Sequence, residues 1–228
     1  MKTIGIIGGL GPHSTIKYYE WLTQGVQDAL GGVNSAKIIL TSLNGEEIKN
    51  IRMAGDKDKE GALFAAEAKK LENAGADFLL IASNTSHKNV PYIEAAVSIP
   101  LLHLADATAK KILNSGVDTV ALLGTAPTME HNFYKSRLID AGLNVIVPDD
   151  TDRVFISDTI YSEMVKGIVR PEVNVAFETI IKKMEDAGAK GVILGCTELT
   201  LLDLKNVSLP LFDTLRIHVD AALELTLS

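Results

Sequence analysis

The sequence ENAGADFLLIASNT (residues 72–85) recurs 113 residues further along the chain as EDAGAKGVILGCTE (residues 185–198). In both copies a glycine follows a helical pattern, and a short apolar run then leads to small polar residues. Glycine is common just after a helix, and a short apolar run bounded in this way indicates a buried strand. The repeat therefore predicts two similar α/β units, with Ser83 and Cys196 at the ends of equivalent strands.

Two further pairs of segments match in the same order along the chain. TIGIIGG (residues 3–9) matches TVALLGT (residues 119–125), and VSIPL (residues 97–101) matches VSLPL (residues 207–211). Three matches in one order indicate an internal duplication. The expected fold is α/β, with two similar Rossmann-like lobes. Each has a mainly parallel sheet flanked by helices, and a pseudo-two-fold axis relates the lobes.

Short apolar runs alternate with longer segments of helical period. Strands are expected at residues 2–8, 37–43, 77–83, 99–104, 118–124, 143–147, 190–196 and 209–213. Helices are expected at Lys59–Ala74, where Leu63, Ala66 and Leu71 would share the buried face, and at Glu172–Ala187.

The boundaries of the lobes depend on two prolines that each open an expected strand, Pro100 and Pro210. If these strands cross between the lobes, lobe one comprises residues 1–98 and 209–228 and lobe two comprises residues 99–208. The first lobe is then discontinuous in sequence.

The composition narrows the class of protein. Of the 228 residues, 46% are hydrophobic and 22% are charged, as in soluble folded chains. The net charge of −7 argues against nucleic acid as a partner, because binding to a phosphate backbone needs clustered cations. No apolar run reaches the roughly 18 residues of a membrane span, and there is no secretory leader, so we expect a cytoplasmic protein without membrane contact. One cysteine and five scattered histidines predict no disulfide and no metal site.

Ligands of open α/β sheets bind beyond the carboxyl ends of the strands, so we expect the site in a cleft between the lobes. The candidate residues are those that follow the matched strands, namely Gly9, Leu10, Ser83, Asn84, Thr85, Thr125, Cys196 and Thr197.

Cys196 and Ser83 each have a structural and a chemical interpretation. A lone cysteine is more often an inert apolar side chain, and Ser83-Asn84-Thr85 alone is typical of a polar turn that caps a helix. As partners across a pseudo-dyad, the two side chains would instead face one ligand from opposite sides. That arrangement suits removal and return of a proton at a stereocentre. The glycine before Cys196 and the small polar residues after it favour an ionisable thiol.

Taken together, these motifs resemble those of a known family. The order of a Gly-Gly loop, Asn84-Thr85 with His87, Gly124-Thr125 and Gly195-Cys196-Thr197-Glu198 resembles the cofactor-independent aspartate/glutamate racemase superfamily, and is most similar to its aspartate racemases. The resemblance covers essentially the whole chain. It implies a racemase of an acidic amino acid, aspartate or possibly glutamate, that needs no cofactor and forms a homodimer. It also implies two cysteines that flank the α-carbon of the substrate; here the α-proton would be removed and returned between Cys196 and the Ser83 side.

One residue departs from the family pattern, because Ser83 occupies the position of the first cysteine. It is either a natural variant, an engineered replacement, or a sign of other chemistry. The resemblance also implies that Lys166 binds the side-chain carboxylate of the substrate, although a solvated lysine at a helix end would look the same. Arg52 is a weaker candidate for that role. His87 and Glu198 are expected to orient or tune the hydroxyl and the thiol.

Three other functions are compatible with parts of the sequence. A dinucleotide enzyme is disfavoured, because a G-x-G-x-x-G motif starting at Gly9 would end at Ser14. A two-lobed binding protein for small anions would use the same cleft without needing Cys196. A decarboxylase similar to the arylmalonate decarboxylases, or another isomerase, would need Cys196 but not an acidic amino acid.

Overall fold

The computed structural model describes residues 1–228, apart from the side chain of Pro12, and divides them into two compact units. Unit 1 comprises residues 1–104 and 218–228, and unit 2 comprises residues 105–217. Unit 1 is therefore discontinuous, with crossings after Leu104 and Ile217, whereas the sequence predicts crossings after residues 98 and 208.

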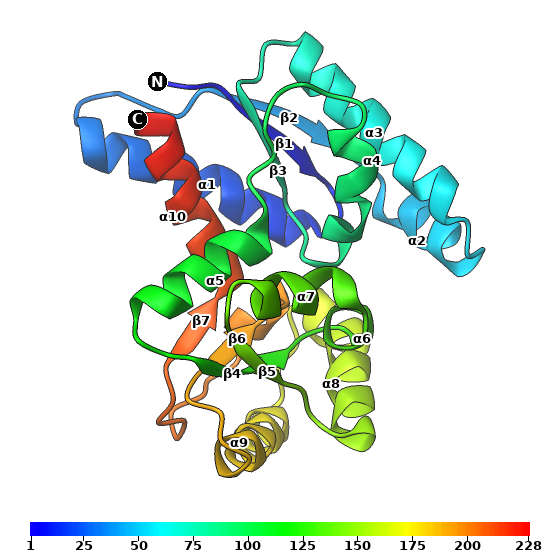
Figure 1. Ribbon diagram of the computed structural model, residues 1–228, viewed down its shortest axis with the longest axis vertical. Coiled ribbons are helices and arrows are strands. Elements are labelled where there is room, and N and C mark those ends of the chain that lie inside the picture. Colours follow the sequence, from blue (N-terminus) through cyan, green and yellow to red (C-terminus); the bar gives the residue numbers. More distant parts are fainter. The chain divides into compact units, whose positions relative to one another are not determined.

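Unit 1 contains a parallel three-stranded sheet in the order β2-β1-β3. Its strands are β1 (Ile4–Gly8), β2 (Ile38–Ser42) and β3 (Phe78–Ile81). Its helices are α1 (Pro12–Leu30), α2 (Gly45–Met53), α3 (Lys57–Asn73), the 3-10 helix η1 (Thr85–Asn89), α4 (Val90–Glu94) and most of α10 (Thr214–Leu227). In Figure 1, α1 and α10 cover one face of this sheet, and α3 and α4 cover the other.

Helix α3 confirms the expected helix, and Gly75 follows its end with a positive φ of 96°. The predicted buried face is confirmed at Leu71, which is buried, and in part at Leu63, which is partly buried, but it is wrong at Ala66, which is exposed. Phe64 and Ala68 are buried instead, in one core cluster with Ile7 of β1. Residues 64, 68 and 71 have the i, i+4, i+7 spacing of one helix face, which residue 66 does not share.

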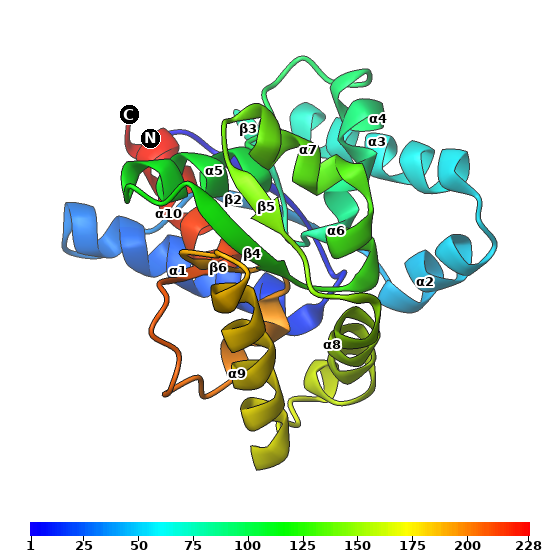
Figure 2. The same ribbon diagram turned by 60° about the horizontal axis from the view of Figure 1, so that its bottom comes forward.

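Unit 2 contains a parallel four-stranded sheet in the order β5-β4-β6-β7. Figure 2 labels three of these strands, β5, β4 and β6, which lie side by side. Its strands are β4 (Thr119–Leu123), β5 (Asn144–Ile146), β6 (Val192–Leu194) and β7 (Leu211–Asp213). Its helices are α5 (Leu104–Asn114), α6 (Ala126–Glu130), α7 (Asn132–Asp140), α8 (Asp150–Ser162), η2 (Met164–Lys166), α9 (Pro171–Asp186) and η3 (Thr197–Leu201). Its core joins α6, α8 and α9 to β4 and β6.

The two units repeat one topology, as the sequence predicts. Strands β2-β1-β3 of unit 1 correspond to β5-β4-β6 of unit 2, and the single bridge from Leu79 to Leu101 corresponds to the pairing of β6 with β7. The repeat extends to side chains. Glu72 accepts a hydrogen bond from the Ser98 hydroxyl, and Glu185 accepts one from the Ser208 hydroxyl at the equivalent position.

Two expected strands differ from the prediction. Residues 99–104 form only the bridge at Leu101, because their backbone hydrogen bonds to β3 all involve Leu79, and α5 already begins at Leu104. The strand expected at 209–213 is observed as β7, but it pairs with β6 and so lies in unit 2 rather than in lobe one. The chain returns to unit 1 only within α10.

Candidate active site

The loop after β1 is shaped by contacts that leave no room for a side chain. Gly9 has a φ of 77°, and a Cβ at this position would overlap the carbonyl oxygen of Leu43. The Gly9 N–H donates to Thr15 Oγ1 at 2.9 Å. Gly9 is therefore held inside the loop, and its amide is not available to a ligand. Leu10, the next candidate residue, is partly buried.

The segment after β3 carries the candidate residues of the same unit. Ile7 of β1 is in register with Ile81 of β3, so Ser83 follows the strand beside the one that leads to Gly9. Ser83 is partly buried, and its Oγ accepts a hydrogen bond from Ser86 Oγ at 3.1 Å. Asn84 is buried and precedes η1, whose first residue is Thr85. Unit 1 thus brings together five of the predicted residues: Gly9, Leu10, Ser83, Asn84 and Thr85.

His87 acts on Ser83 through the backbone rather than through the hydroxyl. Its Nδ1 donates to the Ser83 carbonyl at 2.8 Å, and its Nε2 accepts from the Leu104 N–H at 3.3 Å. This pair of bonds requires a neutral ring with its proton on Nδ1. The ring is almost completely buried and lies 4.6 Å from the ring of His103, centroid to centroid. His87 therefore fixes the turn in which Ser83 lies.

In unit 2, Gly195 comes directly after β6, and Cys196 follows Gly195. A Cβ on Gly195 would lie 2.7 Å from the carbonyl oxygen of Leu123 on β4, closer than real Cβ atoms approach such an atom. The Gly195 N–H also donates to that oxygen, at 2.7 Å. Glycine at this position lets β6 run close to the end of β4. As a result, Cys196 lies beside the turn that contains Thr125.

The thiol of Cys196 makes a short hydrogen bond to a carboxylate. Its Sγ donates to Glu198 Oε2 at 2.9 Å, and Thr197 Oγ1 donates to the same oxygen at 2.8 Å. Burial, followed by the negative charge of Glu198, raises the pKa of the Cys196 thiol well above its usual value. Burial and the facing Glu198 carboxylate thus oppose the ionisation of the thiol that the neighbouring glycine and small polar residues favour.

Thr125 and Lys166 are the other predicted residues of unit 2. Thr125 is buried at the start of α6, and its Oγ1 shares a hydrogen bond with Thr128 Oγ1 at 3.1 Å. Lys166 is exposed at the end of η2, which packs against η3 and hence near the turn of Cys196. Both positions are compatible with contacts to a ligand beside the thiol.

Sequence reasoning missed a set of residues that supports Ser83. Arg52 donates to Ser86 Oγ and to the buried carboxylate of Glu60, which also binds Lys88. Because Arg52 is engaged in these contacts, it is poorly suited to bind the side-chain carboxylate of a substrate. No sequence spacing signals this set, since its members come from α2, α3 and η1.

Among the residues that the structure describes, no three His, Cys, Asp or Glu side chains lie together as metal ligands. No helix within the same residues combines the length and the apolar character that crossing a membrane requires.

Comparison with known proteins assigns the chain to a family. Residues 7–222 match the model of the family described as Asp/Glu/hydantoin racemase. The chain is 44% identical to a candidate Asp/Glu racemase of solved structure from Yersinia pestis, with complete coverage of both chains and a TM-score of 0.95. It is 34% identical to an aspartate racemase homologue from Pyrococcus horikoshii, again with complete coverage of both chains and a TM-score of 0.87.

A characterised relative is more distant. The chain is 26% identical over 219 residues to the broad specificity amino-acid racemase RacX of Bacillus subtilis, covering 92% of each chain. The family match over nearly the whole chain agrees with the duplicated α/β topology. The chain therefore belongs to the Asp/Glu/hydantoin racemase family, and it is an amino-acid racemase that works without pyridoxal phosphate.

Proposed function

We propose that this racemase acts on an acidic amino acid, aspartate or glutamate, and moves its α-proton between Cys196 and Ser83. The observation that carries the proposal is the equivalence of these two residues, since each lies two residues after the end of the corresponding strand of one repeated topology. Racemisation needs one group to remove a proton and another to return a proton on the opposite face. In this proposal, the Cys196 and Ser83 side chains face the α-carbon of the substrate from opposite sides.

The first proton transfer starts from the bond between Cys196 and Glu198. Because the thiol is the stable form, the proton must leave sulfur before sulfur can act as a base. Glu198 already accepts the S–H, so it takes this proton when the substrate binds. The thiolate then removes the α-proton, and the electron pair of the broken C–H bond passes into the carboxylate of the substrate.

The negative charge that develops on the substrate carboxylate needs donors that are already in place. Neutral donors suit this purpose, because they favour the carbanion without trapping the product. The donors that we propose are the amide of Leu10 and the side chains of Asn84, Thr85 and Thr125. The Thr197 hydroxyl has one proton and donates it to Glu198, so it is left out of this set. His87 holds the turn that presents the first of these side chains.

The preference for an acidic substrate rests on charge. Lys166 is exposed beside η3, and a cation there can pair with a β- or γ-carboxylate. In unit 1, two cations share the single carboxylate of Glu60, which leaves an excess positive charge near Ser83. The resemblance to an aspartate racemase homologue supports the same choice, whereas the resemblance to RacX supports a wider range of amino acids.

The test is proton NMR in deuterated water with L- and D-aspartate and L- and D-glutamate, combined with chiral analysis of the same samples. We expect loss of the α-proton signal together with inversion. Cys196→Ala should abolish both, while Ser83→Cys should leave them unchanged or faster. Ser136→Ala, which changes only an exposed hydroxyl on α7, is the control. No exchange with these four substrates, but activity on neutral amino acids, would replace acidic specificity by broad specificity.

A decarboxylase is a second candidate, because the chain contains a single thiol. A lone thiol can protonate a carbanion from one side only. The same protein samples incubated with an arylmalonate would distinguish this case, since release of carbon dioxide without amino-acid exchange would favour it.

We also propose that the protein is a cytoplasmic homodimer. The mechanism needs Cys196 as a free thiol, which a reducing compartment preserves.

Ile16 and Tyr19 on α1 are exposed near Leu40 of the edge strand β2, and such an apolar surface suits a second copy. Tyr18 on the same helix is completely buried in unit 1 and is no part of this surface. Light scattering of wild type and of Tyr19→Glu would test the dimer.

A further inference from the structure

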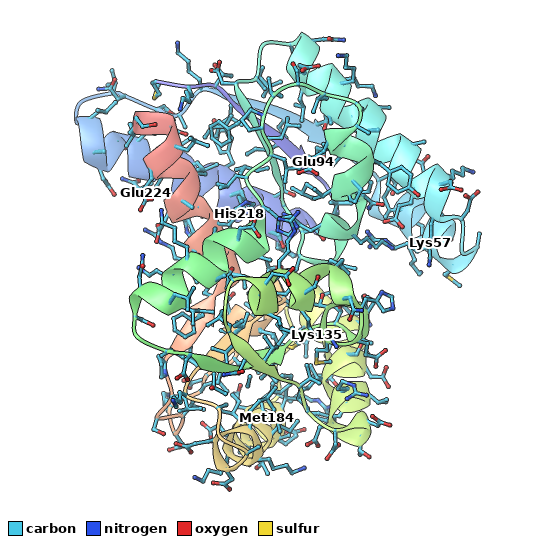
Figure 3. The ribbon with its side chains drawn as sticks, viewed as in Figure 1. Lys57, Glu94, Lys135, Met184, His218 and Glu224 are labelled. Atoms are coloured by element: carbon cyan, nitrogen blue, oxygen red, sulfur yellow. The ribbon has the colours of Figure 1, made fainter. Side chains whose placement is uncertain are left out.

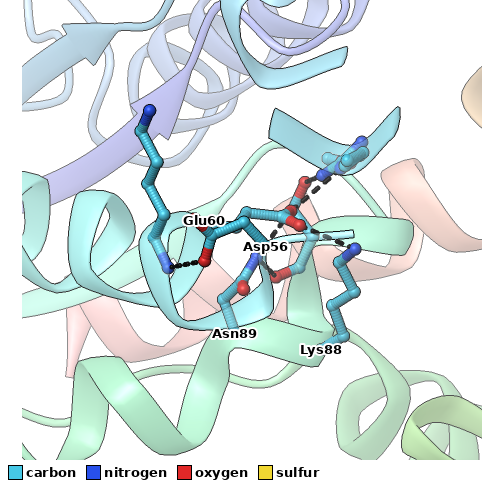
Figure 4. Close-up of polar contacts among 8 residues, drawn as sticks. Asp56, Glu60, Lys88 and Asn89 are labelled. Carbon is cyan, nitrogen blue, oxygen red and sulfur yellow. Dashed lines mark hydrogen bonds and ion pairs between the residues drawn. The ribbon is translucent and has the colours of Figure 1, made fainter. Parts of the chain in front are cut away.

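A buried carboxylate organises the polar contacts behind Ser83. Only 2% of the Glu60 side chain on α3 is exposed. Its Oε1 accepts from Arg52 Nε at 2.9 Å and from Asn89 Nδ2 at 3.0 Å, and its Oε2 accepts from Lys88 Nζ at 2.8 Å. Figure 4 shows Lys88 and Asn89 converging on Glu60. The carboxylate therefore holds Arg52 in one orientation.

A second nitrogen of Arg52 is connected to Ser83 by hydrogen bonds through the Ser86 hydroxyl. Arg52 Nη2 donates to Ser86 Oγ at 2.9 Å, and Ser86 Oγ donates to Ser83 Oγ at 3.1 Å. Ser86 is completely buried. A guanidinium group can only donate, so Ser86 Oγ must accept from Arg52 and must direct its own proton to Ser83.

The donor-to-acceptor directions of these hydrogen bonds determine what the Ser83 hydroxyl can do. Ser83 Oγ accepts from Ser86, so its own proton is left to point elsewhere. A chain of donors that starts at a cation also polarises each hydroxyl in turn, which stabilises negative charge at its far end. The contacts therefore favour Ser83 as a donor of protons rather than as an acceptor.

We propose that Arg52, held by Glu60 and acting through Ser86, is a positioning residue that makes Ser83 the proton donor of the racemisation. This inference rests on the proposed function. In the step, the Ser83 O–H bond breaks, a C–H bond forms at the α-carbon, and the oxygen keeps the electron pair as an alkoxide. Ser86 donates to that alkoxide, and Arg52 supplies the positive charge behind it. Water then returns a proton to Ser83 and accepts the proton held on the Cys196 side, which restores the resting enzyme.

The need for such support follows from the residue type. A serine hydroxyl gives up a proton far less readily than a thiol does, so it needs a neighbour that stabilises the charge left behind. Arginine suits this position because its planar fork binds Glu60 with one nitrogen and Ser86 with another. Lysine, with one nitrogen, could not hold both partners in this geometry.

The test separates inversion from exchange. With the enantiomer whose α-proton faces Cys196, exchange of that proton for deuterium needs only the thiol side, whereas inversion also needs the Ser83 side. We expect Ser86→Ala and Arg52→Met to lower the ratio of inversion to exchange by about tenfold or more, while exchange continues. Arg137→Met, which removes an exposed ion pair with Asp106, should leave the ratio unchanged.

A second measurement tests whether Arg52→Met acts through Ser83 or only by disturbing the fold. In a Ser83→Cys background the proton donor is a thiol, which needs less support, so adding Arg52→Met should change the ratio much less than it does in the wild-type background. The inference is overturned if Arg52→Met lowers inversion and exchange in parallel, or if its effect is equal in both backgrounds. Failure of the proposed function has a different signature, because the wild-type protein would then exchange no α-proton of any amino acid.

Discussion

Cys196 and Glu198 form a hydrogen-bonded pair in which the carboxylate opposes ionisation of the thiol. The carboxylate lies 2.9 Å from the sulfur and adds to the effect of burial in raising the pKa of the thiol. In the proposed mechanism, the same carboxylate accepts the thiol proton.

Replacement of Glu198 by Gln should separate these two effects. Without the negative charge, the pKa of Cys196 should fall, because the largest charge that opposes thiolate formation is gone. Alkylation of Cys196 by iodoacetamide, followed over a pH series, should therefore reach its midpoint at lower pH than in wild type. Racemisation should nevertheless slow down, because the proton acceptor is lost. Glu130→Gln, an exposed glutamate paired with Arg153, is the control. An unchanged alkylation midpoint would contradict the assignment.

Gly195 determines where the thiol lies. An alanine Cβ there would lie 2.7 Å from the Leu123 carbonyl oxygen, so the end of β6 must shift. We expect Gly195→Ala to destabilise the protein by about 1–3 kcal/mol and to lower kcat/KM by about 100-fold, because small displacements of reacting groups are costly. Urea unfolding and racemase kinetics measure the two effects. A folded variant with wild-type kinetics would show that the close approach of β6 to β4 has no catalytic importance.

At the scale of elements, Glu60 joins α2, α3 and η1 through its bonds to Arg52, Lys88 and Asn89. Burial alone would raise the pKa of Glu60, but the hydrogen bonds from Lys88 and Asn89 and the charge of Arg52 together lower it. The ionised carboxylate is therefore the form that stabilises these elements. This contribution is present above the usual pKa of a glutamate and is lost as the pH falls through the lowered pKa of the folded state.

Replacement of Glu60 by Gln should leave two cations without their common partner. We expect a loss of about 2 kcal/mol in the free energy of unfolding at pH 7, less than for a fully buried pair because both cations are partly exposed. The loss should shrink as the pH is lowered toward 3, since wild type then loses the same charge. Urea unfolding at several pH values measures this. Glu46→Gln, whose partner Lys49 is exposed, should cost close to nothing.

At the scale of the whole molecule, His218 ties the C-terminal helix into unit 1. Its Nε2 donates to the Leu102 carbonyl at 2.9 Å, and its Nδ1 accepts from the Tyr18 hydroxyl at 2.7 Å. The side chain, labelled in Figure 3, is completely buried. Burial lowers its pKa from 6.5 to about 4. The neutral ring thus fastens α10 to α1 and to the segment that precedes the crossing into unit 2.

This histidine should make the protein sensitive to mild acid. The unfolded chain binds a proton at His218 below about pH 6.5, whereas the folded protein does not until about pH 4. The contribution of His218 to stability is therefore complete above pH 6.5 and declines as the pH falls toward 4. Between pH 7 and pH 5, the loss should amount to about 2 kcal/mol. Urea unfolding should show a smaller loss over this range for His218→Gln. An equal loss in both proteins would assign the acid sensitivity to other groups.

The sequence alone determined the duplicated α/β topology and the strand-end residues of the candidate site. Both depend on local information, namely the period of apolar residues, the glycines that end helices and the order of matched segments. Duplication made the prediction stronger, because two copies of one pattern report the same fold independently. The sequence also predicted that Ser83 and Cys196 follow equivalent strands, which the register of β3 and β6 confirms.

The tertiary structure alone decided how these residues are supported. Arg52 reaches Ser86 from 34 residues away, and Tyr18 meets His218 from 200 residues away. The Leu101 bridge in place of a strand and the pairing of β7 with β6 were also beyond the local pattern. Such contacts depend on the packing of separate elements and on the rotamers that packing permits, which no spacing within one segment encodes. For the same reason, only the tertiary structure shows that the pKa of Cys196 is raised, since it buries the thiol and places Glu198 against the sulfur.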